Sequence, residues 1–371
     1  MNGSNSMVFS KISRWLYIAL SISLLFLSIM LIVYGVQAYD WHDFEVFYSA
    51  ARAAIEGRSI YIIVGQYDLP FWYFPWVAWF FIPFSFWSYE FGLLLYQITS
   101  LVTAVSILVV LSWHYDPQFK PLHIVLIFGL IAPMSIQLMQ VGQMDYILLA
   151  LIVAAIFAVE KKMDILVGLL LPFIWIKPHL VIIFTLFAII RSGKRTVFVS
   201  GGLIIFMLLL ETLLSPGWHL EMLNLLKIGT QRVDGLQFTT FPSLLGFQEN
   251  WVGTGNLPIT IFLVIFALAT TWYFRSLPTI PFLSLALTAS LFCAPRAYAY
   301  DLPLLIPSII WLTHDNFKRT AWIWVAVTAI ALLSGFGSYS YLATLLVYGL
   351  SLWQAYKSTD STFFVSKAQR T

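Results

Sequence analysis

The sequence has few charged residues. Only 10% of its 371 residues are Asp, Glu, Lys or Arg, whereas 60% are hydrophobic, and the formal net charge is +3. Because a soluble globular domain has about 25% charged residues, this composition excludes an ordinary soluble protein. The absence of a basic stripe or a low-complexity tail also argues against a nucleic-acid partner. We expect one integral membrane domain over residues 1–371 with several transmembrane helices.

Cysteine is almost absent as well. The one cysteine, Cys293, cannot form a disulfide within the chain and lies in an apolar run, which predicts a small buried residue. The sequence also lacks a phosphate-binding Walker loop, a His-rich metal cluster and a serine hydrolase elbow. ATP-driven transport and metal catalysis therefore have no support in the sequence.

Apolar runs recur from one end of the chain to the other. A transmembrane helix needs about 20 apolar residues, and some runs are shorter, as is common where a membrane protein forms a site. The first run follows two basic residues, is too long for a signal-peptide core and is predicted to be a retained span. The thirteen candidate segments are 15–37, 71–88, 90–113, 122–139, 144–159, 165–176, 179–190, 196–214, 257–274, 277–294, 302–313, 320–336 and 340–356.

The positions of Lys and Arg predict the orientation, because cytoplasmic loops carry an excess of them. If both termini are cytoplasmic, thirteen of the twenty basic residues fall on the cytoplasmic side. Both ends inside require an even number of crossings, so 71–88 or 122–139 is not a full span and about twelve transmembrane helices are expected. The cytoplasmic basic residues are Lys11, Arg14, Lys161, Lys162, Arg191, Lys194, Arg195, Arg275, Lys318, Arg319, Lys357, Lys367 and Arg370.

The first extracytoplasmic loop, 38–70, contains a short amphipathic helix by its pattern. Phe44 and Phe47 recur at helical spacing between polar residues, and Gly57 can end the helix. Such a helix is typical of a membrane interface. Asp43 stands at or near its N-terminus, where it either caps the helix or acts as a general base toward a hydroxyl. A larger extracytoplasmic loop, 215–256, is a candidate region for acceptor choice.

Polar residues interrupt the apolar runs at two corners that face the same outer side. Gln143 and Asp145 form either a polar turn between helices or part of a cavity lining. Lys177 either extends toward the lipid headgroups or binds a phosphate, with His179 beside it. Because ionisable residues at membrane depth are costly, they are candidates for function.

A third outer corner and an aromatic segment complete the candidate cavity. Arg296 either pairs with Asp301 or binds a phosphate, and Tyr298 lies between them. Tyr73 belongs to a segment, 67–84, that is rich in aromatic residues and proline. An aromatic belt at the bilayer interface explains most of these rings, although a bent entry into the membrane also predicts a groove for a lipid tail or a stacking face for a sugar.

These motifs, in this order, resemble glycosyltransferase family 87, a branch of the membrane-embedded GT-C superfamily. The likeness rests on "DFEVFY" at 43–48, "YFP" at 73–75, the Gly-Gln corner at 142–143 and the Lys-Pro corner at 177–178. It covers about the first half of the chain, and hydropathy extends it to the end. The later half departs from the pattern, since family members often carry a Ser/Pro-Trp-His stretch near the position of "APRAYAYD" here.

The resemblance implies a GT-C-like helix bundle whose cavity opens on the extracytoplasmic leaflet of the cell membrane. It implies a polyprenyl-phosphate sugar as donor, commonly mannose in characterised relatives, a glycan or glycolipid acceptor and an inverting transfer. Carried over by position, Asp43 is the general base and Tyr48 belongs to the cavity. The leaving phosphate needs a nearby cation, for which Lys177 and Arg296 are candidates. Since the donor is already activated, neither ATP nor another cofactor is expected. We also expect no metal, because a monophosphate carrier can leave without a divalent ion.

Two other functions are compatible with the same sequence. A transporter or flippase of a lipid-linked sugar also needs an amphiphilic cavity with cationic groups. The acidic residue at the outer surface, in a chain with few charges at the membrane midplane, favours the enzyme. A non-catalytic scaffold in cell-envelope assembly is the third possibility, and full activity of an Asp43→Asn protein in cells would favour it.

Overall fold

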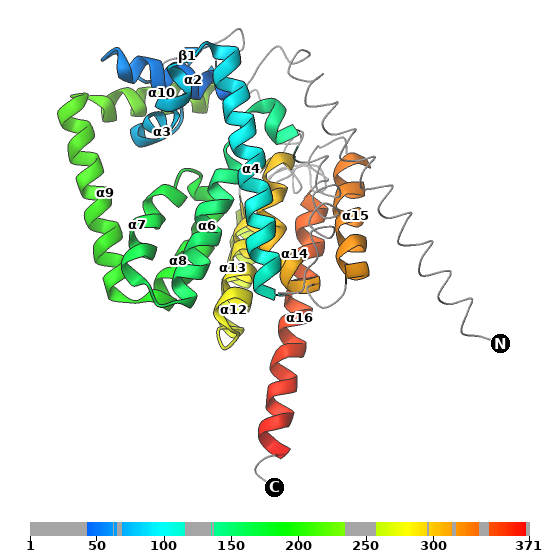
Figure 1. Cartoon of the computed structure of the whole chain (residues 1–371). Helices are drawn as coiled ribbons and strands as arrows, with labels where there is room; N and C mark the ends of the chain where they lie inside the picture. The colour runs from blue at the N-terminus through cyan, green and yellow to red at the C-terminus, as the bar shows by residue number, and fades with distance from the viewer. Residues whose placement is uncertain are drawn as a thin grey trace.

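The computed structural model of the chain describes residues 43–61, 63–64, 69–115, 135, 137–233, 257–294, 297–313, 317–333 and 341–368. Within these residues the chain is almost entirely helical (Figure 1). The exception is an antiparallel pair of two-residue strands, β1 (Ile63–Val64) and β2 (Leu69–Pro70). The prediction of a helical architecture is therefore confirmed for the described part of the chain.

Most helices begin and end within a few residues of the predicted apolar segments. The segment 15–37 lies outside the described residues, as does nearly all of 122–139. The described helices are α2 (Asp43–Ile55), α3 (Pro75–Ser85), α4 (Tyr89–Tyr115), α6 (Asp145–Glu160), α7 (Asp164–Ile174), α8 (Pro178–Ser192), α9 (Lys194–Leu214), α10 (Trp218–Val233), α12 (Leu257–Tyr273), α13 (Thr279–Phe292), the 3-10 helix η2 (Ala299–Leu305), α14 (Ile306–Thr313), α15 (Phe317–Leu333) and α16 (Tyr341–Ala368).

Helix length separates the candidate membrane spans. Among the described residues, α4 and α9 are long and apolar enough to cross a membrane, with 27 and 21 residues. Helix α3 has 11 residues, which is about 16 Å at 1.5 Å per residue and well short of a hydrocarbon core of about 30 Å. The segment 71–88 therefore does not form a full span by itself, and the total of about twelve crossings stays a prediction.

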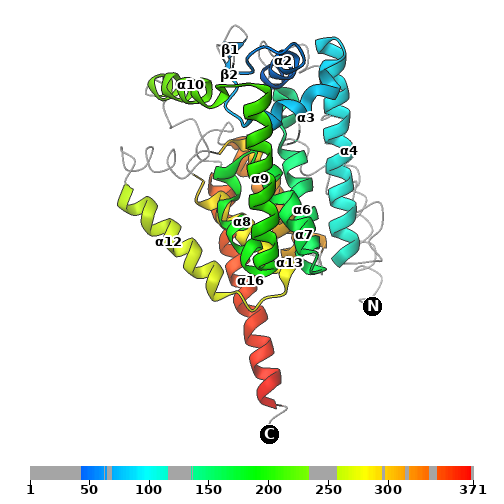
Figure 2. The same ribbon diagram turned by 90° about the vertical axis from the view of Figure 1, so that its left-hand side faces the viewer.

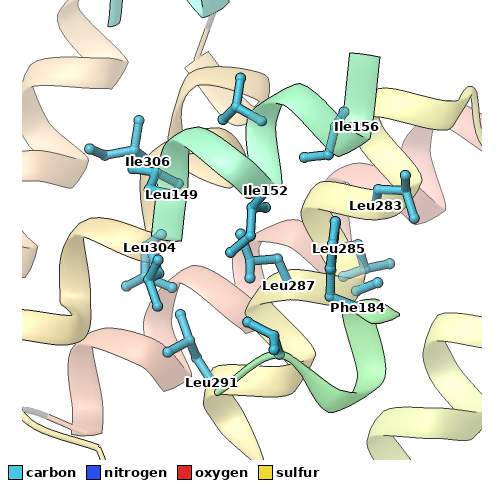
Figure 3. Close-up of a cluster of buried hydrophobic side chains, with 14 of the residues drawn as sticks. Leu149, Ile152, Ile156, Phe184, Leu283, Leu285, Leu287, Leu291, Leu304 and Ile306 are labelled. Atoms are coloured by element: carbon cyan, nitrogen blue, oxygen red, sulfur yellow. The ribbon is translucent and has the colours of Figure 1, made fainter. Parts of the chain in front are cut away.

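Helix α13 lies at the centre of the bundle. Its side chains from Phe282 to Phe292 are all buried, and a helix that is apolar on every side is surrounded by other helices. Figure 3 shows Leu149 of α6, Phe184 of α8 and Leu287 of α13 within one buried cluster. This continuous core holds α6 and α8 together, and these two helices begin at the site described below.

The two ends of the bundle are built differently. Figures 1 and 2 show α2, α3, α10 and the β1–β2 pair gathered at the end where α4 and α6 begin, with α10 crosswise to α9. The turns from α6 to α7, from α8 to α9 and from α12 to α13 lie at the other end. Those turns carry or adjoin Lys161, Lys162, Lys194, Arg195 and Arg275. The basic turns thus share the end opposite to α2.

Candidate active site

Helix α2 begins at Asp43 and is anchored by its aromatic face. Phe44 is fully buried, and Phe47 stacks on Phe81 of α3 with ring centroids 4.5 Å apart and an interplanar angle of 11°. The chain leaves the helix at Gly57, whose φ of +64° is the left-handed conformation common after a helix C-terminus. A helix is therefore present where the sequence predicts one, and its packing fixes the position of Asp43.

A glycine allows the corner before α6 to approach α2 closely. Gly142 has a φ of +74°, and a Cβ built there would lie 2.6 Å from the Cβ of Phe44. Glycine is favoured both by the left-handed backbone and by this lack of space. From the other side, the hydroxyl of Tyr96 in α4 donates to the backbone carbonyl of Gln143 at 2.8 Å. The corner is thus held between α2 and α4.

The side chain of Gln143 joins this corner to the start of α2. Its Nε2 donates a hydrogen bond to Oδ2 of Asp43, across 100 positions of the sequence. Gln143 is buried, and within the described residues its Oε1 has no hydrogen-bond partner. Two residues that the sequence selected separately are therefore in direct contact.

Three charged side chains form a buried network beside this contact. Lys177 Nζ donates to both carboxylate oxygens of Asp145, at 2.9 and 2.8 Å, and to Oδ1 of Asp301 at 2.9 Å. Their exposed fractions are 5%, 0% and 1%. Lys177 directly precedes α8, which begins at Pro178 because proline suits the first position of a helix. Buried charges are tolerated when they are paired and hydrogen-bonded, and this trio satisfies that condition.

Electrostatics keep Lys177 charged in the turn between α7 and α8. Burial by itself would lower the pKa of Lys177, but the attraction of Asp145 and Asp301 outweighs burial and raises that pKa above its usual value. The ring of Tyr300 adds a cation–π contact, with Nζ 5.0 Å from the ring centroid. Burial also raises the pKa of the Tyr73 phenol above its usual value, so Tyr73 presents a neutral hydroxyl.

The loop that leads into η2 closes another side of the network. The backbone N–H of Tyr298 donates to Oδ2 of Asp301 at 2.6 Å, and the rings of Tyr298 and Tyr300 stack with centroids 4.8 Å apart. Asp301 thus binds Lys177 through one oxygen and its own loop through the other. This arrangement fixes the loop against the turn between α7 and α8.

These elements surround a cavity of about 400 Å³, which lies at the α2 end of the bundle because residues of α2 line it. Its volume is within the range of small-molecule sites in proteins. One part of the lining is aromatic or aliphatic and another carries carboxylate, amide, ammonium and imidazole groups, so the cavity is amphiphilic. The lining residues are Asp43, Val46, Phe47, Pro70, Trp72, Tyr73, Gln143, Ile176, Lys177, Pro178, His179, Tyr298, Tyr300 and Asp301.

Most of the predicted site residues meet at this cavity, and two of the described ones do not. Asp145 lies behind Lys177 and is fully buried. Tyr48 is on another face of α2, where its hydroxyl donates to the backbone carbonyl of Trp87 at 2.8 Å. Arg296 lies outside the described residues, and the carboxylate of Asp301, its alternative partner in the sequence, binds Lys177.

Several lining residues were not selected from the sequence. Trp72 belongs to the aromatic segment 67–84, and nothing in the sequence distinguishes it from the other aromatic residues there. With an exposed fraction of 37%, it is the most accessible ring of the cavity. Val46 and Ile176 are apolar residues in apolar surroundings, so no pattern in the sequence marks them. A signal was available only for Pro70, which stands before the aromatic entry at residues 71–74.

Comparison with known proteins assigns the chain to a family. The family model described as glycosyltransferase family 87 matches residues 71–295, which is more than half of the chain. The matched range contains Tyr73, Gln143 and Lys177, whereas Asp43 and Asp301 lie on either side of it. No curated protein and no solved structure matches the chain.

Proposed function

The chain belongs to glycosyltransferase family 87 and is a membrane glycosyltransferase, and from this premise we propose that it transfers mannose or another hexose from a polyprenyl-phosphate donor to an acceptor hydroxyl. The observation that carries the proposal is the cavity, in which the Asp43 carboxylate and the Lys177 ammonium line one chamber. A lipid-linked sugar phosphate is amphiphilic, as this lining is. The donor class comes from the family resemblance, and the cavity chemistry supports it.

In the proposed reaction Asp43 is the general base. One of its carboxylate oxygens accepts the proton of the acceptor hydroxyl, and the hydroxyl oxygen forms a bond to the anomeric carbon of the sugar. The bond from that carbon to the phosphate oxygen breaks, and the polyprenyl phosphate leaves with the electron pair. Attack opposite to the leaving group inverts the anomeric configuration. A base must lie within hydrogen-bond reach of the proton that it accepts, and Asp43 lines the cavity where the acceptor would bind.

The leaving phosphate requires positive charge at the cavity. Lys177 lines it, but two carboxylates already contact its ammonium. Together with Asp43, the ionised network would carry more negative than positive charge, which disfavours a phosphate unless further cations contribute. We therefore assign phosphate binding to Lys177 together with His179, which lines the cavity, and Arg296, which lies two positions before Tyr298 in the sequence. No metal is required in this scheme.

The proposed orientation places the cavity on the extracytoplasmic side of the cell membrane, with both termini in the cytoplasm. The basic turns lie at the end of the bundle opposite to α2, and basic loops are typical of the cytoplasmic side. Helix α2 would then lie in the outer interface, where a phosphate at headgroup level can reach the cavity while the polyprenyl chain stays in the bilayer.

A transfer assay tests the proposal. Purified protein is incubated with polyprenyl-phosphate hexoses and a glycolipid acceptor, and the product is quantified and its anomeric configuration determined by NMR. Asp43→Asn should bind donor but lose transfer by about 10²-fold or more, as expected for a general base. Glu45→Gln is the matched control, because Glu45 lies in the same turn of α2 and does not line the cavity.

Three results would refute parts of the proposal. Normal turnover by Asp43→Asn would remove Asp43 as the base. Retention of the donor's anomeric configuration would exclude single inverting displacement. Movement of labelled donor across vesicle membranes without any transfer product would instead support the alternative function, a transporter or flippase of lipid-linked sugars.

A further inference from the structure

We propose that Gln143 is a positioning residue for the general base, and that its side-chain amide holds the Asp43 carboxylate in the orientation needed for transfer. This inference rests on the proposed function, in which Asp43 is that base. The observation behind it is the hydrogen bond from Gln143 Nε2 to Asp43 Oδ2 inside the cavity. Nothing in the reaction scheme itself requires a glutamine at this place.

Only one orientation of the amide fits next to a carboxylate. If the amide were turned over, Gln143 Oε1 would face Asp43 Oδ2, and two acceptors would repel each other. In the observed orientation, Oε1 is buried and has no donor among the described residues. Leaving a buried acceptor unpaired is unfavourable, so the contact with Asp43 is what orients this side chain.

The backbone that carries Gln143 is itself held in place. The hydroxyl of Tyr96 donates to its carbonyl at 2.8 Å, and Gly142 contacts the start of α2 so closely that a Cβ would lie 2.6 Å from the Cβ of Phe44. The amide therefore extends from a corner that packs directly against α2 and is hydrogen-bonded to α4. Asp43 is thus fixed twice, through its own helix and through Gln143.

This restraint matters because proton transfer depends on geometry. The terminal torsion of an aspartate side chain is broad, so an unrestrained carboxylate samples orientations in which its lone pairs do not face the acceptor. A displacement of about 1 Å can reduce turnover by about 10²-fold. Binding of the donor does not depend on this torsion, so loss of the restraint should lower kcat and leave the donor KM almost unchanged.

The test compares two buried glutamines, Gln143 in the corner before α6 and Gln97 in the neighbouring helix α4. Gln143→Met keeps the length of the side chain and removes the donor. We expect kcat to fall by about 10- to 100-fold, the range for loss of one hydrogen bond to a charged group, with the donor KM within about threefold of wild type. The control is Gln97→Met, because Gln97 donates to the backbone carbonyl of Met139 at 3.1 Å, is equally buried and does not line the cavity.

A purely structural role for Gln143 would give a different pattern. A wild-type kcat in Gln143→Met would overturn the inference. The inference would also fail if kcat, donor affinity and thermal stability fell together in Gln143→Met, by the same amounts as in the control Gln97→Met. A second measurement uses the Asp43→Asn background, in which Gln143→Met should reduce the residual transfer no further, since Gln143 acts only through Asp43. If the losses of transfer caused by Asp43→Asn and Gln143→Met multiplied in the double variant, the two residues would act independently.

The outcomes separate this inference from the proposed function. If Asp43→Asn is fully active, the assignment of the base fails and the role of Gln143 fails with it. If Asp43→Asn is inactive while Gln143→Met has wild-type kcat, the base stands and only the positioning role is refuted.

Discussion

Replacement of Lys177 by methionine should strongly destabilise the protein. The substitution removes the three hydrogen bonds of Nζ and leaves the carboxylates of Asp145 and Asp301 buried without their cation. Both carboxylates contact the same nitrogen, so their oxygens lie within about 6 Å of each other and would repel by about 3 kcal/mol at an effective dielectric constant of about 20. Removing one partner of a buried ion pair typically costs about 3 to 5 kcal/mol.

The lone cysteine provides the assay. Cys293 is buried, with an exposed fraction of 8%, and it is the one cysteine in the sequence. A thiol-reactive fluorescent dye therefore reports unfolding of the purified protein on heating. Lys177→Met should shift the labelling midpoint to a clearly lower temperature, whereas Lys161→Met, an exposed site at the opposite end of the bundle, should change stability by less than about 0.5 kcal/mol.

A triple variant tests whether uncompensated charge causes the loss of stability. Neutralising the partners in Lys177→Met/Asp145→Asn/Asp301→Asn removes the repulsion between carboxylates and should restore much of the lost stability, because neutral replacement of a buried ion network is often tolerated. If Lys177→Met alone costs less than about 1 kcal/mol, the network does not stabilise the fold. If the triple variant is no more stable than Lys177→Met, uncompensated charge is not the cause of the loss.

Two further predictions concern backbone space and buried charge. Gly142→Ala should cost about 1 to 3 kcal/mol and reduce transfer at least about tenfold, because its Cβ would displace the Cβ of Phe44 at the start of α2. Transfer assays and thiol labelling measure the two effects. The control is Gly201→Ala in α9, where no atom lies within 4 Å of the new Cβ; it should leave transfer nearly unchanged and should not lower stability, since alanine favours a helix more than glycine does. Glu211 is 3% exposed, and its Oε1 has no hydrogen-bond partner within the described residues. Because an unpaired buried polar atom costs about 1 to 3 kcal/mol, Glu211→Met should raise the temperature midpoint of thiol labelling. A lower midpoint would contradict this explanation.

The sequence predicts the elements of this protein well because their signals are local. Scarce charge and long apolar runs indicate a helical membrane protein, and hydropathy alone delimits most of the described helices. The helical spacing of Phe44 and Phe47, with Gly57 after them, predicts α2. Hydropathy does not show, however, how far each helix extends into the membrane. For this reason 71–88 was a candidate span although its helix has only 11 residues.

The candidate site was predictable as a set of residues but not as an arrangement. Buried polar groups are costly, so Asp43, Gln143, Lys177 and Asp301 stand out in an apolar chain. Their partners do not, because a contact between positions 43 and 143, or 177 and 301, depends on how the helices pack. For the same reason the sequence did not predict that the fold brings Lys177 to the carboxylate of Asp301.

By itself, the sequence determined that the chain is a helical membrane protein, where most of its described helices run, and which polar residues are exceptional. The tertiary structure decided which of these residues meet, that Asp145 and Tyr48 lie away from the cavity surface, and that apolar residues such as Trp72 line it. The physical reason is that burial and periodicity act along a few turns of one helix, whereas a cavity forms only where distant helices and loops pack against one another.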